Sequence, residues 1–388
     1  MKGMARKAMA MKAVALNPTI TILTIFFFFL CGVPVYAHSR RLSEKSGIAG
    51  HRSVIDRPGI DGSVIDRSAI DRSGRSSPID TNLILYGRGL YPGDDSTFEN
   101  IKTSGFTTVV LSSFYIHANG DLYSGDSRSP IIHNGEYVGD KDWLKRVASL
   151  KQGVSSVRRI EILLEGRWIN QPPNTFDFIK DWTDPSNSAP GIATGTGRKS
   201  TLYELCKVLK KTIGADAICV DDESVYDSPS IVLLGKMAHK LHLHMTLCPF
   251  KNAEYWKAIL TGSHSTGSRR DIVDAVYLQC YDGGKNNVPG QWVKDLATDI
   301  PVYPIFLCRG SFGVCGAVHN GKTPDEIKTE MAAFKKDYPG LAGGAIWQMA
   351  DIKSYIRRNC AVQDPSSGSA TSTVEYLAQL RNSLKDGL

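Results

Sequence analysis

Apolar and polar residues follow a regular alternation from Asn82 towards the end of the chain. Short apolar runs, partly β-branched, predict buried strands. The longer stretches between them have apolar residues at every third or fourth position, which predicts amphipathic helices. Eight runs have the strand pattern: Leu83 to Gly87, Thr107 to Phe114, Ile160 to Leu164, Asp216 to Asp221, Leu243 to Cys248, Ala275 to Cys280, Val302 to Leu307 and Gly344 to Gln348.

Several of the intervening stretches carry helix-start signals. Thr201-Leu202-Tyr203-Glu204 has the spacing of a capping box and predicts a helix to about Ile213. Ser228-Pro229 and Thr323-Pro324 each place a capping residue before a proline at the first helical position. A last helix is expected from about Ser372 to Leu384.

Alternation of strand and helix, repeated eight times, predicts an α/β fold of the closed (β/α)8 TIM-barrel type. A doubly wound open sheet is the competing architecture. That fold calls for a glycine-rich phosphate loop after the first strand, and Tyr86-Gly87-Arg88-Gly89-Leu90 matches one poorly. In a barrel, the active site is expected at the carboxyl ends of the strands.

The amino terminus has the composition of a targeting segment. Basic residues precede an uncharged run whose centre is Ile20 to Leu30, and Val35-Tyr36-Ala37 resembles a signal-peptidase site. We therefore expect a signal peptide over residues 1–37 and a secreted protein, with an uncleaved membrane anchor as the alternative. After cleavage no stable membrane insertion is expected.

Residues 38–80 differ from the rest of the chain. Ile-Asp recurs every five residues at Ile55, Ile60, Ile65 and Ile70, among Gly, Ser, Pro and Arg and without an aromatic residue. Such a segment has too little apolar area to repay ordering, so it is read as a flexible repeat linker before a barrel domain at 81–388.

The charge balance gives no indication of a nucleic-acid partner. The 388 residues carry a net charge of +7. The first 37 residues contribute four basic residues and no acid, which leaves 7 − 4 = +3 for the remainder. No basic stripe with interleaved aromatic residues is present.

The fourth predicted strand ends in three consecutive acids, Asp221, Asp222 and Glu223. Because side chains alternate along a strand, Asp221 and Glu223 project to one side and Asp222 to the other. Two carboxyls on one face raise each other's proton affinity, so one can act as a general acid near neutral pH. An acidic strand-to-loop cap is the simpler alternative for an isolated triplet.

Other strand ends carry polar and aromatic residues. The sixth strand ends in Gln279, Tyr281 and Asp282, the eighth contains Trp347, and Trp168 follows the third. A tryptophan offers a flat apolar surface to the C–H face of a sugar ring, and hydroxyl and amide groups supply directional hydrogen bonds. Acids and aromatic residues around one rim indicate a carbohydrate ligand.

These motifs resemble glycoside hydrolase family 18, which includes chitinases, endo-β-N-acetylglucosaminidases and chitinase-like lectins. The resemblance covers about residues 82–350. It rests on Asp-x-x-x-x-Asp-x-Glu from Asp216 to Glu223, Gln-x-Tyr-Asp from Gln279 to Asp282, and Gly-Gly-x-x-Trp ending at Trp347. The chain departs from the family pattern at Cys219, where the middle acid is usual, and at Glu165-Gly166-Arg167-Trp168, where Ser-x-Gly-Gly is common.

The resemblance implies a retaining, substrate-assisted mechanism. Glu223 would protonate the leaving oxygen, Asp221 would hold the substrate's N-acetyl group and Tyr281 would bond to it. Further contacts with the substrate are expected from Asp216, Asp222, Gln279, Asp282, Trp347 and Trp168. The mechanism implies no cofactor or metal. The thiol of Cys219 would shift the pH profile or slow the reaction.

The predicted protein is thus a secreted, monomeric hydrolase of chitin or N-glycan cores. One alternative is a sugar-binding protein on the same barrel, without turnover. Another is a hydrolase of a different sugar family, which would not need the acetamido group. Cys308 and Cys315, on either side of a short loop, are the expected disulfide.

Overall fold

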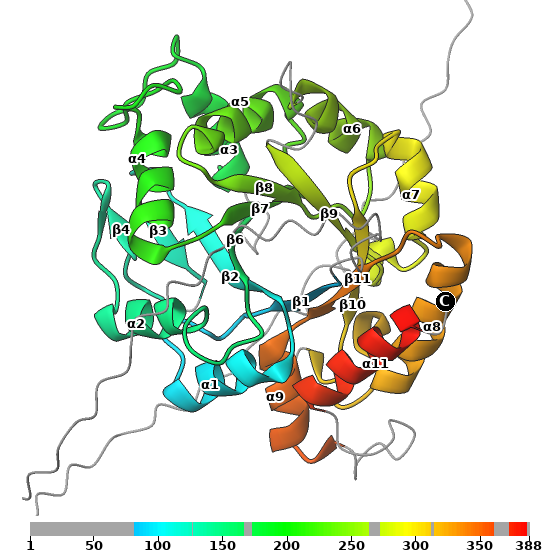
Figure 1. Ribbon diagram of the computed structural model, residues 1–388. Coiled ribbons are helices and arrows are strands. Elements are labelled where there is room, and N and C mark those ends of the chain that lie inside the picture. Colours follow the sequence, from blue (N-terminus) through cyan, green and yellow to red (C-terminus); the bar gives the residue numbers. More distant parts are fainter. Residues whose placement is uncertain are drawn as a thin grey trace, which may run out of the picture. The chain divides into compact units, whose positions relative to one another are not determined.

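The computed structural model describes residues 81–125, 127–166, 173–263, 272–311, 314–360 and 372–385. Eight parallel strands form a closed barrel (Figure 1), because β1 pairs with both β2 and β11. The strands are β1 (Asn82–Tyr86), β2 (Thr108–Ile116), β6 (Arg159–Glu165), β7 (Ala217–Asp221), β8 (His244–Leu247), β9 (Val273–Gln279), β10 (Val302–Leu307) and β11 (Gly343–Trp347). The predicted TIM barrel is confirmed.

Helices surround the barrel in Figure 1. They are α1 (Asp95–Ser104), α2 (Lys141–Ser149), α3 (Thr175–Thr183), α4 (Thr201–Val208) with η1 (Leu209–Ile213), α5 (Ser228–His239), α6 (Ala253–Gly262), α7 (Pro289–Leu296), α8 (Pro324–Asp337), α9 (Met349–Arg357) and α11 (Thr373–Lys385). None of the helices in these described ranges is both long and apolar enough to cross a membrane. The predicted signal and linker, residues 1–80, lie outside the described residues.

The helix starts follow the capping signals, with two shifts. Thr323 caps α8, as the sequence predicts, and it forms with Glu326 the reciprocal bonds of a capping box. The cap of α4 is Ser200 rather than Thr201, because the Ser200 hydroxyl accepts from the Tyr203 amide at 3.3 Å. The cap of α5 is likewise Asp227, one residue before the predicted Ser228.

Two departures from simple β/α alternation lie near the carboxyl ends of the strands. β2 continues into an antiparallel extension made of β3 (Leu122–Ser124), β4 (Ile132–His133) and β5 (Glu136–Tyr137). The stretch between β6 and α4 contains α3, whose start is closed by a capping box at Asn174. Both additions lengthen the connections on the side of the barrel where the site is expected.

The predicted last helix is confirmed as α11, which packs against α8. The Tyr376 hydroxyl donates to the Lys322 carbonyl at 2.8 Å and accepts from the Arg309 amide at 3.0 Å. The predicted Cys308–Cys315 disulfide is wrong, because Cys315 pairs with Cys360. Cys308 is a buried free thiol that donates to the Gln348 carbonyl at 3.4 Å.

Candidate active site

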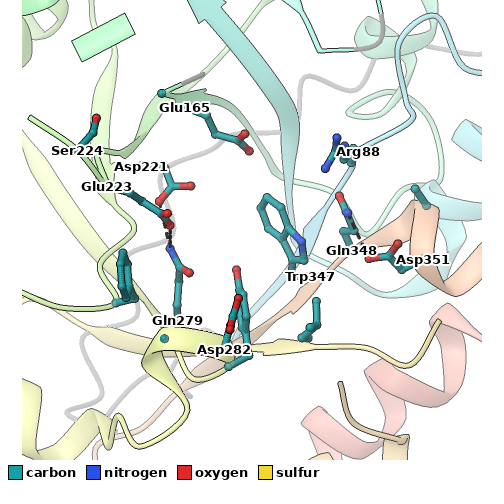
Figure 2. Close-up of a pocket in the computed structure, with 16 residues that line it drawn as sticks. Arg88, Glu165, Asp221, Glu223, Ser224, Gln279, Asp282, Trp347, Gln348 and Asp351 are labelled. Atoms are coloured by element: carbon teal, nitrogen blue, oxygen red, sulfur yellow. Dashed lines mark hydrogen bonds between the residues drawn. The ribbon is translucent and has the colours of Figure 1, made fainter. Parts of the chain in front are cut away.

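A cavity of about 660 Å³ opens at the carboxyl ends of the strands. Figure 2 shows its charged and aromatic side chains arriving from different strand ends around the barrel. The residues that line it include Arg88 after β1, Glu165 on β6, Asp221 and Glu223 at β7, Phe250 after β8, Gln279, Tyr281 and Asp282 at β9, Trp347 and Gln348 at the end of β11, and Asp351 on α9.

Gln279 links the two acids that the sequence singles out. Its amide nitrogen Nε2 donates to Asp221 Oδ1 at 3.1 Å and to Glu223 Oε1 at 3.0 Å (Figure 2). The carboxyls of Asp221 and Glu223 are therefore held around one amide group, inside the cavity. The structure thus brings Asp221, Glu223 and Gln279 together.

Both carboxyls hold protons more firmly than ordinary acids do. Burial, and then the charges of Glu223 and Glu165, raise the pKa of Asp221 well above its usual value. Burial also raises the pKa of Glu223, against the lowering effects of the Gln279 hydrogen bond and the Lys251 charge. The Glu223 side chain is exposed to the cavity, but surrounding protein atoms still desolvate its carboxyl. A proton shared by such a pair is available near neutral pH.

Asp222 has a structural role and does not line the cavity. Its carboxylate accepts from the amides of Ser224, Val225 and Tyr226, and from the Tyr255 hydroxyl at 2.8 Å. The side chain is 1% exposed, so the expected substrate contact is corrected to a loop support that holds the turn after Glu223. Alternation along the strand places it on the face opposite Asp221.

Asp216 lies at the other end of the barrel. It precedes the first residue of β7, accepts from the Ile160 amide at 2.9 Å, and pairs with Lys151 Nζ at 2.8 Å. A five-residue strand separates it from the cavity, which corrects the expected substrate contact. Trp168, the other expected contact from the third strand, lies outside the described residues.

An aromatic wall completes the cavity. The rings of Trp347 and Tyr281 are stacked with centroids 6.5 Å apart, and Trp347 also contacts Tyr86 at 5.0 Å. Burial raises the pKa of Tyr281 well above its usual value, so its hydroxyl stays a hydrogen-bond donor. Asp282 lines the rim and pairs with His319 at 3.2 Å.

The cavity also contains polar residues that the expected site omits. Glu165 accepts hydrogen bonds from the Ser113 hydroxyl and, at 2.8 Å, from the Tyr115 hydroxyl. Gln348 Nε2 donates to Asp351 at 3.2 Å, while its Oε1 is buried without a hydrogen-bond partner among the described residues. The signal for Glu165 was present in the sequence, since it is an acid at a predicted strand end.

Beneath the acids, the barrel interior is lined with thiols and a tyrosine. The Tyr86 hydroxyl lies 3.8 Å from the Cys219 sulfur and 3.6 Å from the Cys248 sulfur. Cys219 is buried on β7, two residues before Asp221. Within the described ranges, no group of three or more His, Cys, Asp or Glu side chains is arranged to hold a metal ion.

The solved structures similar in fold are mostly chitinases. The GH18 chitinase ChiB of Flavobacterium johnsoniae is 14% identical over 80% of this chain and 95% of its own, with a TM-score of 0.48. A tamarind chitinase-like lectin is 12% identical over 73% of this chain and 98% of its own, with a TM-score of 0.41. A sugar phosphate isomerase/epimerase of Parabacteroides distasonis is 10% identical over 81% and 97%, with a TM-score of 0.42.

No protein-family model matches the sequence. A search of curated proteins likewise finds no match. Identities this low do not carry function from one protein to another, so the function has to be inferred from the site itself.

Proposed function

We propose that the protein is a secreted glycoside hydrolase that cleaves glycans containing β-linked N-acetylglucosamine, such as chitin or N-glycan cores, with retention of configuration. The observation that supports this best is the arrangement of Asp221 and Glu223 around the Gln279 amide, in a cavity walled by Tyr281 and Trp347. An acid that keeps its proton, a second carboxyl beside it and an aromatic wall are what this hydrolysis needs.

In the first step, Glu223 gives its proton to the glycosidic oxygen as the bond from that oxygen to the anomeric carbon breaks. The carbonyl oxygen of the substrate's own acetamido group forms the new bond to the anomeric carbon. Asp221 accepts a hydrogen bond from the acetamido N–H, and the protonated Tyr281 hydroxyl donates to the same group. Water then attacks the anomeric carbon as the bond from that carbon to the acetamido oxygen breaks. Glu223, now the base, takes the proton of this water, and the configuration is retained.

The sugar ring would lie against Trp347, which is only partly buried and so offers a ring face to the cavity. Asp282 and Gln279 would bond to hydroxyl groups at the rim. Export follows from the leader predicted at residues 1–37, and the protein is proposed to act as a monomer.

A sugar-binding protein without turnover is the second candidate. It is favoured by Cys219, because a thiol stands where the resembled hydrolases carry a further carboxyl. A free thiol is ordinarily uncharged at neutral pH and cannot support the charge distribution of the acid pair. The candidates differ in turnover and not in sugar binding.

The test is hydrolysis of chitooligosaccharides and a high-mannose glycoprotein by the purified protein and by Glu223→Gln. We expect kcat to fall by about 10²- to 10⁴-fold in this variant, because it lacks the proton donor. Glu254→Gln, at an exposed position of α6, is the matched control and should keep its activity.

The outcomes separate the candidates. Equal turnover by the protein and by Glu223→Gln would remove Glu223 from the mechanism. Sugar binding with no turnover in either would favour the binding protein. Equal cleavage of substrates without an acetamido group would exclude substrate assistance.

A further inference from the structure

Glu165 contributes a third carboxyl to the cavity. It is the last residue of β6 and the direct partner of Asp221 in the β6–β7 register. Paired residues on neighbouring strands lie about 4.8 Å apart and point to the same side of the sheet. Figure 2 shows the Glu165 carboxyl directed into the same cavity as Asp221.

The surroundings of Glu165 favour its charged form over that of Asp221, its partner in the register. Hydroxyl groups donate to both of its oxygens, from Ser113 to Oε1 and from Tyr115 to Oε2. The positive charge of Arg88, at the end of β1, acts in the same direction. Asp221 accepts from the Gln279 amide, which it shares with Glu223, and from the Cys248 thiol, a weaker donor. Between the paired residues of β6 and β7, negative charge is therefore stabilised better on Glu165 than on Asp221.

We propose that Glu165 is a positioning residue for the acid pair: its carboxylate stays charged beside Asp221 and thereby retains a proton on Asp221 or Glu223 at neutral pH. The inference rests on the proposed hydrolase function and adds to it the group that keeps the general acid protonated. Cys219, on β7, supplies no carboxylate beside Asp221. Glu165, on the neighbouring strand β6, would supply that negative charge instead.

Other titratable groups face the cluster and modify the effect. Burial, and to a smaller extent the charge of Glu223, raises the pKa of Glu165, whereas the hydrogen bonds from Ser113 and Tyr115 and the charge of Arg88 lower it. The remaining groups near the three carboxyls are Arg88, Tyr281 and Asp282, which line the cavity, Asp222 and Lys251, which do not, and Cys219 and Cys248 beneath Asp221. The positive charges of Arg88 and Lys251 oppose the effect of the Glu165 charge on the acid pair. They therefore limit the size of the expected shift in pH.

The first experiment is the pH profile of kcat for the protein, Glu165→Gln and Tyr115→Phe. Removing a negative charge beside Asp221 makes the pair lose its proton at lower pH, so the basic limb should move down by about one pH unit in Glu165→Gln. Tyr115→Phe keeps the carboxyl but removes one donor, so a smaller shift in the same direction is expected. Glu161→Gln, on the same strand but at the opposite end of the barrel, should leave the limb in place.

The second experiment does not depend on turnover. An infrared titration follows the protonated-carboxyl band that Asp221→Asn or Glu223→Gln removes, and this band should disappear at about one pH unit lower in Glu165→Gln. An inactive protein would refute the proposed hydrolase, while this band would still decide the role of Glu165. Lost turnover in folded Glu165→Gln with the limb and the band unmoved would overturn the proposal and make Glu165 a structural support of the cavity.

Discussion

Arg159 holds two acids together at the amino end of the barrel, and its removal gives the clearest stability prediction. Its Nε donates to Glu161 Oε1 at 2.6 Å, and its two terminal nitrogens donate to Asp274 at 2.8 and 2.9 Å. Glu161 is fully buried, and its other contacts are the hydroxyl groups of Tyr277 and Thr246. Arg159→Met leaves that carboxylate buried without its cation.

Breaking a buried ion pair by removing one partner costs about 3–5 kcal/mol, because an uncompensated charge remains in the interior. We expect about 4 kcal/mol for Arg159→Met, since Asp274 loses its bidentate partner as well. Urea unfolding followed by circular dichroism measures this loss. The adjacent, exposed arginine gives a matched control, and Arg158→Met should cost about 0.5 kcal/mol or less.

A double variant tests the physical reason. Adding Glu161→Gln to Arg159→Met removes the unpaired buried charge while the amide keeps bonding to Tyr277 and Thr246. We therefore expect the double variant to be more stable than Arg159→Met by about 2 kcal/mol. Two purely additive losses, or a loss in Arg159→Met no larger than in Arg158→Met, would refute the reasoning.

Three further predictions concern single features. Asp94 caps α1, and its pKa is lowered mainly by hydrogen bonds from Ser96 and Thr97. Asp94→Ala should lower the free energy of unfolding in urea by about 1 kcal/mol at neutral pH. This difference between the two proteins should vanish as the pH falls through the lowered pKa, because the carboxylate is then protonated. The Cys315–Cys360 bond closes a 45-residue separation; Cys315→Ser should cost about 4 kcal/mol, and reductant should destabilise only the parent protein. Trp347→Ala should weaken chitooligosaccharide binding by about 10-fold or more in calorimetry; unchanged affinity would remove the aromatic wall from the binding site.

Much of the barrel was readable from the sequence because its strands are buried on both faces. Such strands are continuous apolar runs, and all eight predicted runs overlap the strands of the barrel. β3, β4 and β5 were not predicted, since elements of two or three residues show no period. The caps of α4 and α5 were misplaced by one residue because capping residues stand side by side, at Ser200 and Thr201 and at Asp227 and Ser228.

The site was predicted in outline for a similar reason. Strand ends of a parallel barrel meet at one rim, so Asp221, Gln279 and Trp347 were expected together and line one cavity. Asp216 was misplaced because the family motif was carried over as a whole, although the predicted strand, Asp216 to Asp221, already put Asp216 at the end opposite the expected site. The disulfide was misassigned since Cys315 and Cys308 are close in sequence, whereas Cys360 reaches Cys315 only after the chain has passed through β11 and α9.

Acidic side chains at the two ends of the barrel have different partners. At the amino end, Glu161 has a cation and two hydroxyl groups as partners, which is how a buried carboxylate is stabilised. At the carboxyl end, Glu165, Asp221 and Glu223 lie together, and no lysine or arginine in the described ranges forms an ion pair with any of them. Such a cluster lowers stability, and the fold could have neutralised it as it does Glu161. Packing does not explain why these three acids lie close together in a cavity with an aromatic wall. Proton transfer to a ligand explains their arrangement better.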